Sequence, residues 1–325
     1  MKSLLKKTSL NPIKNFYPAF SVQAKTEFSI RTLQLLEFEK VIKVFAKNEE
    51  WNPGIYDYLP FYSAYQDGHK GLFSNNNQLI ASLSAARYSR DFAFLGIYIV
   101  DPSYREKGVG ERLAKTVLSE LESCSLLGLN GVKQQVGNYQ RKYGFRPDYN
   151  NLRFSGTLKP PLRKSLEPEE KIKIIGQENL NINQLIDFDA SVFSFPRESF
   201  LWKWLEMPES FLLAAIKDVA SIDKKKICGY GVVSKCVSGY KIAPFFAKNE
   251  KIAKALYDGF SSRFKGKLMQ VDIPEPNQSA IKLATQFGLY KTLETKRMYK
   301  GTNKLVDELN SKIDQVYSLT SLEMG

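Results

Sequence analysis

Histidine and cysteine are scarce in this chain, which has one histidine and three cysteines among 325 residues. A Ser-His-Asp or Cys-His hydrolase would have to use His69, which lies in the segment YQDGHKG. Because this segment is typical of a turn, we expect His69 to be a solvated loop residue. Cys124, Cys228 and Cys236 are odd in number and far apart, which favours neither a disulfide framework nor a zinc site. We therefore expect a reducing compartment and no metal.

Long apolar runs are missing as well. No stretch has the ~20 apolar residues of a membrane-spanning helix, and none resembles the apolar core of a cleaved signal peptide. Residues 1–26 contain lysines but no acidic residue and no arginine, and the lack of arginine argues against a transit peptide. We expect a flexible basic tail over residues 1–26, no membrane span and a cytoplasmic location.

Length and charge set the next limits. A chain of 325 residues, 43% of them hydrophobic, is expected to fold as two domains of ordinary size. The formal net charge of +13 would favour polyanions such as nucleic acid, an anionic membrane surface or the phosphates of a cofactor. Lysine used for solubility explains this charge at least as well, so we expect no specific nucleic acid partner.

Residues 92–118, FAFLGIYIVDPSYREKGVGERLAKTVL, hold the most informative pattern. The apolar run 92–100 predicts a strand buried on both faces, which Asp101-Pro102 ends. The next helix begins inside a loop that contains Gly108 and Gly110. Glycine permits unusual dihedral angles and close approach, so the free N–H groups of residues 107–111 can point together at an anion. The pattern predicts a diphosphate-binding loop.

The segment REKGVG at residues 105–110 resembles the acyl-CoA signature R/Q-x-x-G-x-G/A of the GNAT superfamily of N-acetyltransferases. A glycine motif alone is weak evidence, but a strand precedes this one and a helix follows it, as in that family. The resemblance implies an α+β fold with a mixed α/β sheet and acetyl-CoA as cosubstrate. It also implies that a backbone N–H of the strand at 98–100 stabilises the thioester oxygen as it becomes negative. The implied cofactor-binding residues are Tyr98, Ile99, Val100, Arg105, Glu106, Lys107, Gly108, Val109, Gly110, Glu111 and Asn138.

Asn138-Tyr139 and the following Tyr143-Gly144-Phe145 resemble a second landmark of the family. Many GNAT members place a tyrosine four residues before this glycine, whereas here the tyrosines stand five residues and one residue before it. The departing CoA thiolate can take its proton from a nearby phenol. The resemblance therefore implies Tyr139 or Tyr143 as the catalytic acid, with Tyr139 the first choice.

The turn Trp51-Asn52-Pro53-Gly54 follows a predicted helix at 36–45. In the GNAT arrangement, which this resembles, the loop after the first helix helps to form the acceptor pocket, although an aromatic cluster is also typical of a core. The implied substrate-binding residues are Trp51, Asn52, Tyr56 and Asp57. A primary amine, with a pKa of about 10.4, must lose a proton before it attacks a thioester. The candidates for accepting that proton, directly or through water, are Asp57, Glu50 and Glu49.

The pattern then repeats after a charged, proline-containing linker at 159–170. The first copy has expected strands at 28–32, 79–85 and 92–100. The second copy has expected strands at 171–175, 229–233, 240–246 and 269–273, and expected helices at 182–188, 252–264 and from Asn277 to Phe287-Gly288. We predict a GNAT domain over 27–158 and a degenerate GNAT-like domain over 171–325. The second copy has no glycine at 246–251, where side chains would obstruct a diphosphate, so we expect one cofactor site, in the first copy.

The tandem pattern from about residue 28 onward is similar to the subgroup of the YitH and holothin-acetyltransferase type. Its residues include the turn at 51–54, the segment 98–110 and the last residues TSLEMG. This resemblance implies an N-acetyltransferase that acts on a primary amine of a small molecule by direct attack. Two alternatives stay open: a Fem-like transferase that uses aminoacyl-tRNA, and an acyl-CoA sensor without catalysis. The acceptor and the oligomeric state are left open.

Overall fold

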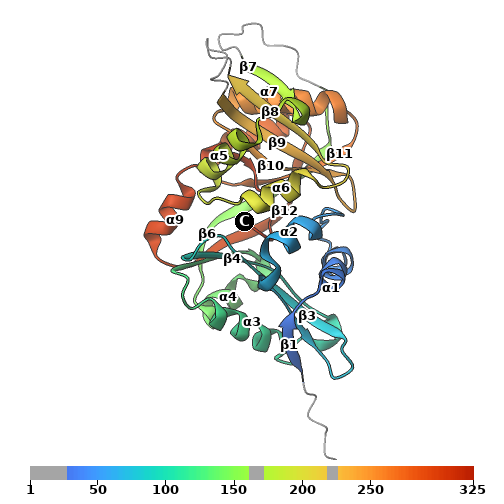
Figure 1. Ribbon diagram of the computed structural model, residues 1–325, viewed down its shortest axis with the longest axis vertical. Coiled ribbons are helices and arrows are strands. Elements are labelled where there is room, and N and C mark those ends of the chain that lie inside the picture. Colours follow the sequence, from blue (N-terminus) through green and yellow to red (C-terminus); the bar gives the residue numbers. More distant parts are fainter. Residues whose placement is uncertain (1–27, 161–171, 218–225) are drawn as a thin grey trace, which may run out of the picture.

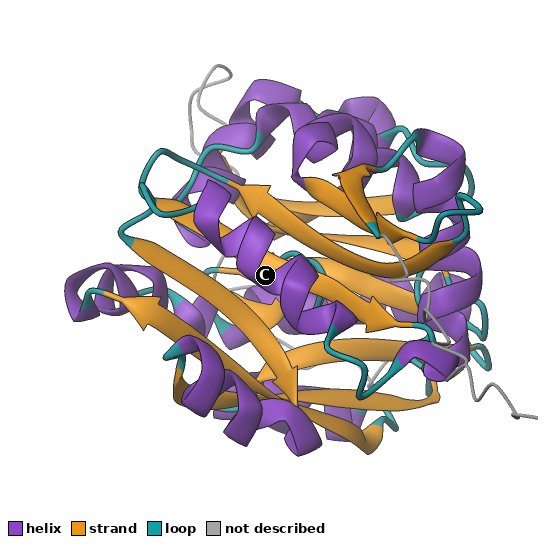
Figure 2. Cartoon of the chain, turned by 90° about the horizontal axis from the view of Figure 1, so that it is seen from below, coloured by secondary structure: helices purple, strands orange, loops and turns teal. Residues whose placement is uncertain are grey.

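A computed structural model of the chain describes residues 28–160, 172–217 and 226–325 (Figure 1). The predicted tail at 1–26 and nearly all of the predicted linker at 159–170 lie outside these residues. A 13-stranded mixed sheet runs through the described chain, and helices cover both of its faces (Figure 2). None of the helices in these three ranges has the length and apolar character needed to cross a membrane.

The first half contains six strands and four α-helices, and the strands and helices expected from the sequence are confirmed. A π-helical segment at Val41–Ala46 continues the first helix, so that the two together match the predicted helix at 36–45. The elements are β1 (Ser29–Thr32), α1 (Leu35–Lys40), α2 (Tyr58–Tyr65), β2 (His69–Phe73), β3 (Leu79–Arg87), β4 (Phe92–Val100), α3 (Val109–Glu120), β5 (Leu126–Val132), α4 (Val136–Tyr143) and β6 (Arg146–Thr157).

The second half repeats this order and adds α9 and β13 at its end. The sequence did not reveal α6, β8, α9 or β13. The elements are β7 (Ile172–Gly176), α5 (Ile182–Phe193), α6 (Glu198–Leu205), β8 (Phe211–Lys217), β9 (Lys226–Lys235), β10 (Tyr240–Ala247), α7 (Glu250–Phe264), β11 (Leu268–Pro274), α8 (Gln278–Gln286), β12 (Tyr290–Gly301), α9 (Asn303–Asn310) and β13 (Val316–Ser318).

The two halves exchange strands at the centre of the sheet. β5 pairs with β12, β12 pairs with β6, and β6 pairs with β11, all antiparallel. β12 of the second half therefore lies between two strands of the first, and β6 of the first half lies between two strands of the second (Figure 1). Because of this exchange, each half completes its part of the sheet with a strand from the other.

A common apolar core also joins the halves. Helices α2 and α6 pack together, with the ring of Phe61 stacked 6.1 Å from Phe200 and 5.9 Å from Trp204. All three side chains are at most 1% exposed. Burial of such aromatic side chains is among the strongest stabilising contributions in a fold, so the halves are held by packing as well as by backbone hydrogen bonds.

The expectation for His69 is wrong, because this residue is fully buried at the start of β2. Its Nδ1 lies 2.8 Å from Ser84 Oγ, its Nε2 lies 3.0 Å from the carbonyl oxygen of Phe61, and its ring stacks 3.9 Å from Phe38. The glycine before it permits close packing rather than a solvated turn, since a Cβ at Gly68 would lie 2.0 Å from the carbonyl oxygen of Ala85.

Candidate active site

Strands β4 and β5 separate at the centre of the first half. Their parallel pairing covers Phe92–Leu95 and Leu126–Leu129 and then ends. Just beyond this point the register of β3 and β4 shifts, and the buried Ile97 has a φ of 52°. A β-branched residue rarely adopts a positive φ, so β4 contains a strained bulge where it leaves β5.

A cavity of about 1510 Å³ opens between the separated strands. It is lined by residues 95–100 of β4, by Leu129, Asn130 and Val132 of β5, and by the first turn of α3. Beyond Leu95, the backbone N–H and C=O groups on the edge of β4 that faces β5 do not pair with that strand. These groups are available to a ligand that lies between the two strands.

The loop before α3 forms one end of the cavity. Gly108 is the N-cap of the helix with a φ of 76°, and a Cβ placed on it would meet nothing within 4 Å. Gly110 is needed for a different reason, because a Cβ there would lie 2.7 Å from Tyr98 Oη and 2.9 Å from Val100 Cγ2. The N–H groups of the first turn of α3 have no partner within the helix, and the helix dipole adds positive potential there. This end is suited to bind phosphate groups.

The structure brings most of the predicted cofactor residues to this cavity. Two differ: the side chain of Lys107 is exposed beside Tyr104, and that of Val109 is buried in the core. Their predicted contribution was through backbone N–H groups, which remain part of the loop. The predicted cofactor residues that line the cavity are Tyr98, Ile99, Val100, Arg105, Glu106, Gly108, Gly110, Glu111 and Asn138.

Arg105 connects the loop to the segment after α1. Its Nε donates a 2.9 Å hydrogen bond to the carbonyl oxygen of Val100, and its guanidinium pairs with Glu49. Both Arg105 and Glu49 line the cavity, so this ion pair lies at its wall. The carboxylate of Glu49, one of the three predicted bases, is already engaged with this cation.

Helix α4 supplies the two tyrosines on the other wall. The Tyr139 ring packs over β5, with its Cδ2 3.1 Å from the place of a Cβ on Gly131. Burial, with a smaller effect of the neighbouring Tyr143, raises the pKa of Tyr139 to about 12. Burial and the neighbouring Tyr143 also raise the pKa of Tyr98 above its ordinary value. These phenols therefore stay protonated at neutral pH, which is the form that a proton donor must have.

Ion pairs connect α4 to α3 at the mouth of the cavity. Lys142 lies 2.8 Å and Lys115 lies 2.9 Å from the carboxylate oxygens of Glu111. Hydrogen bonds from Lys142 and then Lys115 lower the pKa of Glu111 to about 2. Nearby, Asn138 donates to Gln135 and accepts from Arg141, both at 2.8 Å.

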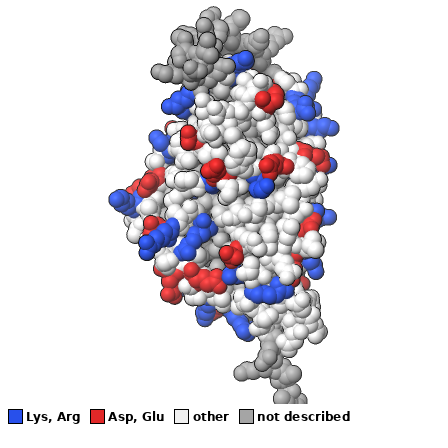
Figure 3. Space-filling view, in the orientation of Figure 1, with Lys and Arg blue, Asp and Glu red and all other residues white. Residues whose placement is uncertain are grey.

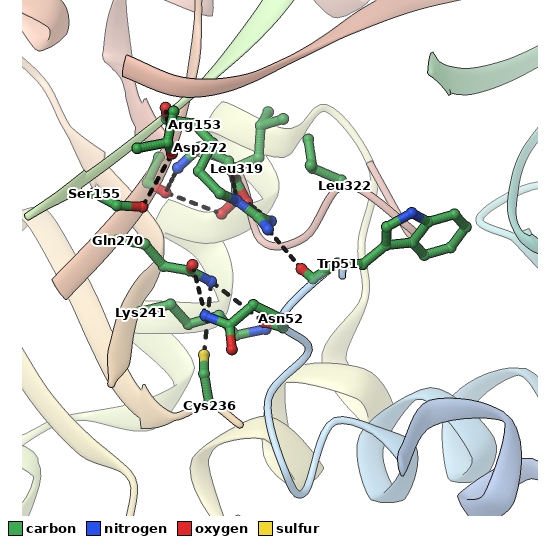
Figure 4. A network of polar contacts seen from close by, with 12 residues as sticks. Trp51, Asn52, Arg153, Ser155, Cys236, Lys241, Gln270, Asp272, Leu319 and Leu322 are labelled. Carbon is green, nitrogen blue, oxygen red and sulfur yellow. Dashed lines mark hydrogen bonds and ion pairs between the residues drawn. The ribbon is translucent and has the colours of Figure 1, made fainter. Parts of the chain in front are cut away.

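The opposite end of the cavity, which we call the acceptor end, is built where the halves meet. It is formed by Trp51, Asn52, Arg153, Gln270 and Glu323. Arg153 of β6 forms a buried ion pair with Asp272 of β11, with N–O distances of 2.7 and 2.8 Å, and donates a 2.6 Å hydrogen bond to the Trp51 carbonyl oxygen. Figure 4 shows this network, from which the indole of Trp51 extends away.

Asn52 is held by the second half of the chain. Its Nδ2 donates to Gln270 Oε1 at 2.9 Å (Figure 4). The same Nδ2 donates to the Ser238 carbonyl oxygen at 3.0 Å, and Asn52 Oδ1 accepts from the Ser238 N–H at 2.8 Å. These bonds fix the turn after α1 relative to β11. The predicted substrate residues Trp51 and Asn52 therefore lie at the cavity.

The other two predicted substrate residues do not line the cavity. Asp57 is 2% exposed, accepts a 2.9 Å hydrogen bond from the Gly54 N–H and forms a 2.5 Å ion pair with Lys241 of β10. Tyr56 packs against the core that the halves share. Asp57 thus holds the turn, Tyr56 belongs to the core, and neither side chain lines the cavity.

Sequence reasoning missed the residues that the second half and β6 contribute to the cavity. No local pattern identifies them, because they reach the site through the exchange of strands. The last residues had been noted only as part of the family resemblance. The missed residues include Arg153, Ser155, Ser238, Gln270, Thr292, Leu293, Glu294, Thr295, Leu322 and Glu323.

The segment 319–325 crosses the separated strands at the acceptor end. Asn130 Nδ2 of β5 donates a 2.7 Å hydrogen bond to the Leu322 carbonyl oxygen, and Tyr88 Oη donates a 2.5 Å bond to that of Met324. On β4, a Cβ at Gly96 would lie 1.9 Å from the carbonyl oxygen of Glu323. A glycine is therefore required where this segment packs on β4.

The second half closes the corresponding place with its own chain. β10 and β11 pair only at Tyr240–Lys241 and Met269–Gln270, and β13 then pairs with β10. On the other side, the Leu319 N–H donates a 2.8 Å bond to the carbonyl oxygen of Asp272 in β11. Asn249 is the N-cap of α7, the position that Gly108 has at the start of α3. The Asn249 side chain accepts a 3.0 Å hydrogen bond from the Ile252 N–H.

Two family models match the chain. The model of the acetyltransferase (GNAT) family matches residues 30–145, and the model of an acetyltransferase (GNAT) domain matches residues 185–318. The chain belongs to the GNAT superfamily and is an N-acyltransferase of that family with two GNAT domains in tandem.

Curated relatives agree with this assignment. The chain is 25% identical to the holothin acyltransferase of Pseudoalteromonas sp. (strain SANK 73390), over 89% of this chain and 92% of that protein. It is 21% identical to the uncharacterized N-acetyltransferase YitH of Bacillus subtilis (strain 168), over 61% of this chain and 66% of the relative.

Solved structures share the fold. A structure from Pyrococcus horikoshii superimposes with a TM-score of 0.73 at 19% identity and covers 97% of this chain and 99% of that one. A tandem GNAT protein from the clavulanic acid biosynthesis pathway superimposes with a TM-score of 0.61 at 12% identity, over 84% of this chain and 98% of that chain.

Proposed function

We propose that this enzyme binds acetyl-CoA in the cavity of the first half and transfers the acetyl group to a primary amine of a small molecule. The observation that carries this proposal is the opening between β4 and β5, which begins at the phosphate-binding end of α3 and runs to the acceptor end. A long, thin cofactor with phosphates at one end and a thioester at the other suits an opening of this form.

The chain's own residues divide the work along the cavity. Gly108, Gly110 and the N–H groups at the start of α3 would bind the diphosphate, with Arg105 beside them. The free edge of β4 would orient the pantetheine arm and supply an N–H to the thioester oxygen. Acetyl-CoA itself supplies an activated acyl group that an unprotonated amine can attack directly.

Catalysis then requires two proton movements. The amine loses a proton as it attacks, and the CoA sulfur takes up a proton as it leaves. Tyr139, or Tyr143 on the next turn of α4, would donate the second proton, since both line the cavity.

A single acyl-CoA site is part of the proposal. The corresponding place in the second half is occupied by β13, which pairs with β10 where the first half is open. Asn249 takes the position of the loop glycine and uses its side chain to cap α7. We propose that the second GNAT domain contributes walls to the acceptor end instead of a second cofactor site.

A small acceptor is favoured over charged tRNA. The acceptor end is lined by Gln270 and Glu323 of the second half in addition to the turn after α1, and Thr292 lines the same cavity. On the face in Figure 3, lysine and arginine are interspersed with aspartate and glutamate instead of forming one basic surface. A tRNA-dependent transferase would need an extended basic surface to bind the phosphate backbone.

The test is turnover of acetyl-CoA with a panel of primary amines that includes holothin, after the name of the relative, and arylalkyl amines. Released thiol gives the rate, and mass spectrometry of the acceptor gives the product. An amide product with stoichiometric thiol release is the expected result. Binding without thiol release with any acceptor would favour the sensor, and salt-dependent tRNA binding without acetyl-CoA binding would favour the Fem-like transferase.

A further inference from the structure

Glu323 is a carboxylate at the acceptor end that is not engaged in the structure. It is half-buried and lines the cavity. No described residue forms an ion pair with its carboxylate or donates a hydrogen bond to it. Its oxygens are therefore available to a molecule in the cavity.

Several other carboxylates at or near the cavity are engaged. Glu49 pairs with Arg105, and Asp57 pairs with Lys241. Glu111 is held by two lysines, and Glu294 lies 2.5 Å from Lys291. A carboxylate that already binds a cation is a weaker base, because the cation stabilises its ionised form. Unlike these four carboxylates, Glu323 has no lysine or arginine paired with it among the described residues.

The position of Glu323 follows from the two strands beneath it. Its backbone packs directly on Gly96, the residue after β4 and β5 stop pairing, and Asn130 of β5 binds the neighbouring Leu322 carbonyl oxygen. The same segment is anchored further along, where Met324 is fully buried in the shared core and its N–H bonds to Ser321 Oγ at 2.9 Å. Glu323 is thus held over β4 at the acceptor end of the cavity, away from the phosphate-binding loop.

The charges around Glu323 come from four elements. Lys241 of β10 and Arg153 of β6 favour its ionised form, while Asp57 and Asp272 of β11 oppose it. Each cation is already paired with one of these aspartates. Burial outweighs the remaining attraction and raises the pKa of Glu323 above its ordinary value. A raised pKa makes a carboxylate a better proton acceptor near neutral pH.

We propose that Glu323 is the general base that accepts the proton of the attacking amine. The N–H bond of the amine breaks toward a Glu323 oxygen as the new C–N bond forms, and the C–S bond then breaks with the sulfur protonated from α4. The inference rests on the proposed acyl transfer. It assigns to the second GNAT domain a catalytic residue for the cofactor site of the first.

Two variants test this role. Glu323→Gln keeps the size of the side chain but cannot accept a proton, and Glu323→Asp keeps the base but shortens it. Glu50→Gln removes a competing carboxylate at the same cavity, and Glu122→Gln is a matched control on the exposed surface after α3. Each protein is titrated with acetyl-CoA and assayed with the amine panel and with water alone as acceptor, between pH 5.5 and 9.5.

We expect Glu323→Gln to bind acetyl-CoA like the wild type and to lower kcat/KM by about 100-fold, the usual scale of a lost general base. The acidic limb that ionisation of Glu323 gives to the wild-type pH profile should disappear in this variant, and its rate should follow only the fraction of unprotonated amine, which rises with pH. Glu323→Asp should restore part of the rate, and Glu122→Gln should match the wild type.

Three outcomes would overturn the inference. Wild-type turnover by Glu323→Gln with the acidic limb kept would remove Glu323 from the reaction and leave the proposed function intact. Loss of activity in Glu50→Gln alone would assign the base to Glu50. Wild-type protein that binds no acetyl-CoA, or that binds it and releases no thiol to any amine or to water, would overturn the proposed function together with this role.

Discussion

The two tyrosines of α4 have different surroundings at the level of single residues. Tyr139 is packed over Gly131, and its pKa is raised to about 12 by burial, whereas Tyr143 lies beside Tyr98 at the cavity wall. A phenol that is buried and protonated is a suitable donor to a sulfur that leaves as a thiolate.

We predict that Tyr139→Phe lowers kcat by about 10- to 100-fold at unchanged affinity for acetyl-CoA, as expected for the loss of a general acid. Tyr143→Phe, which removes the same hydroxyl one turn later, should lower kcat less than threefold. Steady-state kinetics with calorimetric titration separate the two effects. The reverse order of the two variants would assign the acid to Tyr143.

The buried His69 makes stability depend on pH. Burial lowers its pKa to about 4 from an ordinary value of 6.5, so below pH 6.5 the unfolded chain binds a proton that the folded chain excludes. Stability is therefore lost as the pH falls from about 6.5 to 4, and the His69 contribution between pH 7 and 5 is about 2 kcal/mol. Urea unfolding at both pH values measures this loss. In His69→Gln, the loss of stability between pH 7 and pH 5 should be smaller by about 2 kcal/mol, whatever the absolute stability of the variant. An unchanged pH dependence would contradict this explanation.

At the level of elements, a buried ion pair connects the turn after α1 to β10. Asp57 and Lys241 lie 2.5 Å apart and are 2% and 6% exposed. Lys241 also lies 5.2 Å from the centre of the Trp204 ring. Removing one partner of such a pair leaves an uncompensated charge in the interior.

Lys241→Met should therefore lower the free energy of unfolding by about 3–5 kcal/mol. The double variant Asp57→Asn with Lys241→Met, which removes both charges, should lose less than the sum of the two single variants. Chemical denaturation of all four proteins gives this cycle. Additive losses would show that the two side chains act independently.

Periodicity and turn residues predicted most elements but not all. The apolar run of β4 and the helical spacing of α3 and α7 are confirmed, because their burial patterns are local. β2 was missed because glycines needed for close packing resemble turn residues. β13 has only three residues, too few for a periodic pattern.

At the level of the whole molecule, the order of strands could not be predicted from a single sequence. The repeat predicted two domains, whereas β6 and β12 each pair with strands of the other half. Pairing over such long separations is decided by tertiary packing and leaves no local signal. The same reason explains why the phosphate-binding end of the cavity was found from the sequence, whereas only Trp51 and Asn52 were found at the acceptor end.

This exchange predicts that neither half folds alone as a stable monomer. A fragment of residues 1–160 would leave β6 without either of its partners and would expose an edge of β5, and unpaired edges favour aggregation. Co-expressed fragments 1–160 and 171–325 should instead purify as a one-to-one complex by size exclusion. A fragment 1–160 that is monomeric and unfolds cooperatively would contradict this prediction.

The central claim is that the glycine loop before α3 binds the phosphates of acetyl-CoA. It can be tested with two variants that impose the same backbone strain. Gly108 and Gly266 have φ angles of 76° and 75°, and a Cβ on either would meet nothing within 4 Å. Gly108 lines the cavity, and Gly266 lies in the turn between α7 and β11.

The most direct measurement is calorimetric titration of acetyl-CoA into the wild type, Gly108→Glu and Gly266→Glu. A carboxylate at residue 108 should block the phosphates by bulk and by like charge. The account predicts saturable one-to-one binding by the wild type and Gly266→Glu and none by Gly108→Glu. Equal binding by all three proteins would place the cofactor elsewhere, and no binding by the wild type would contradict the acetyltransferase itself.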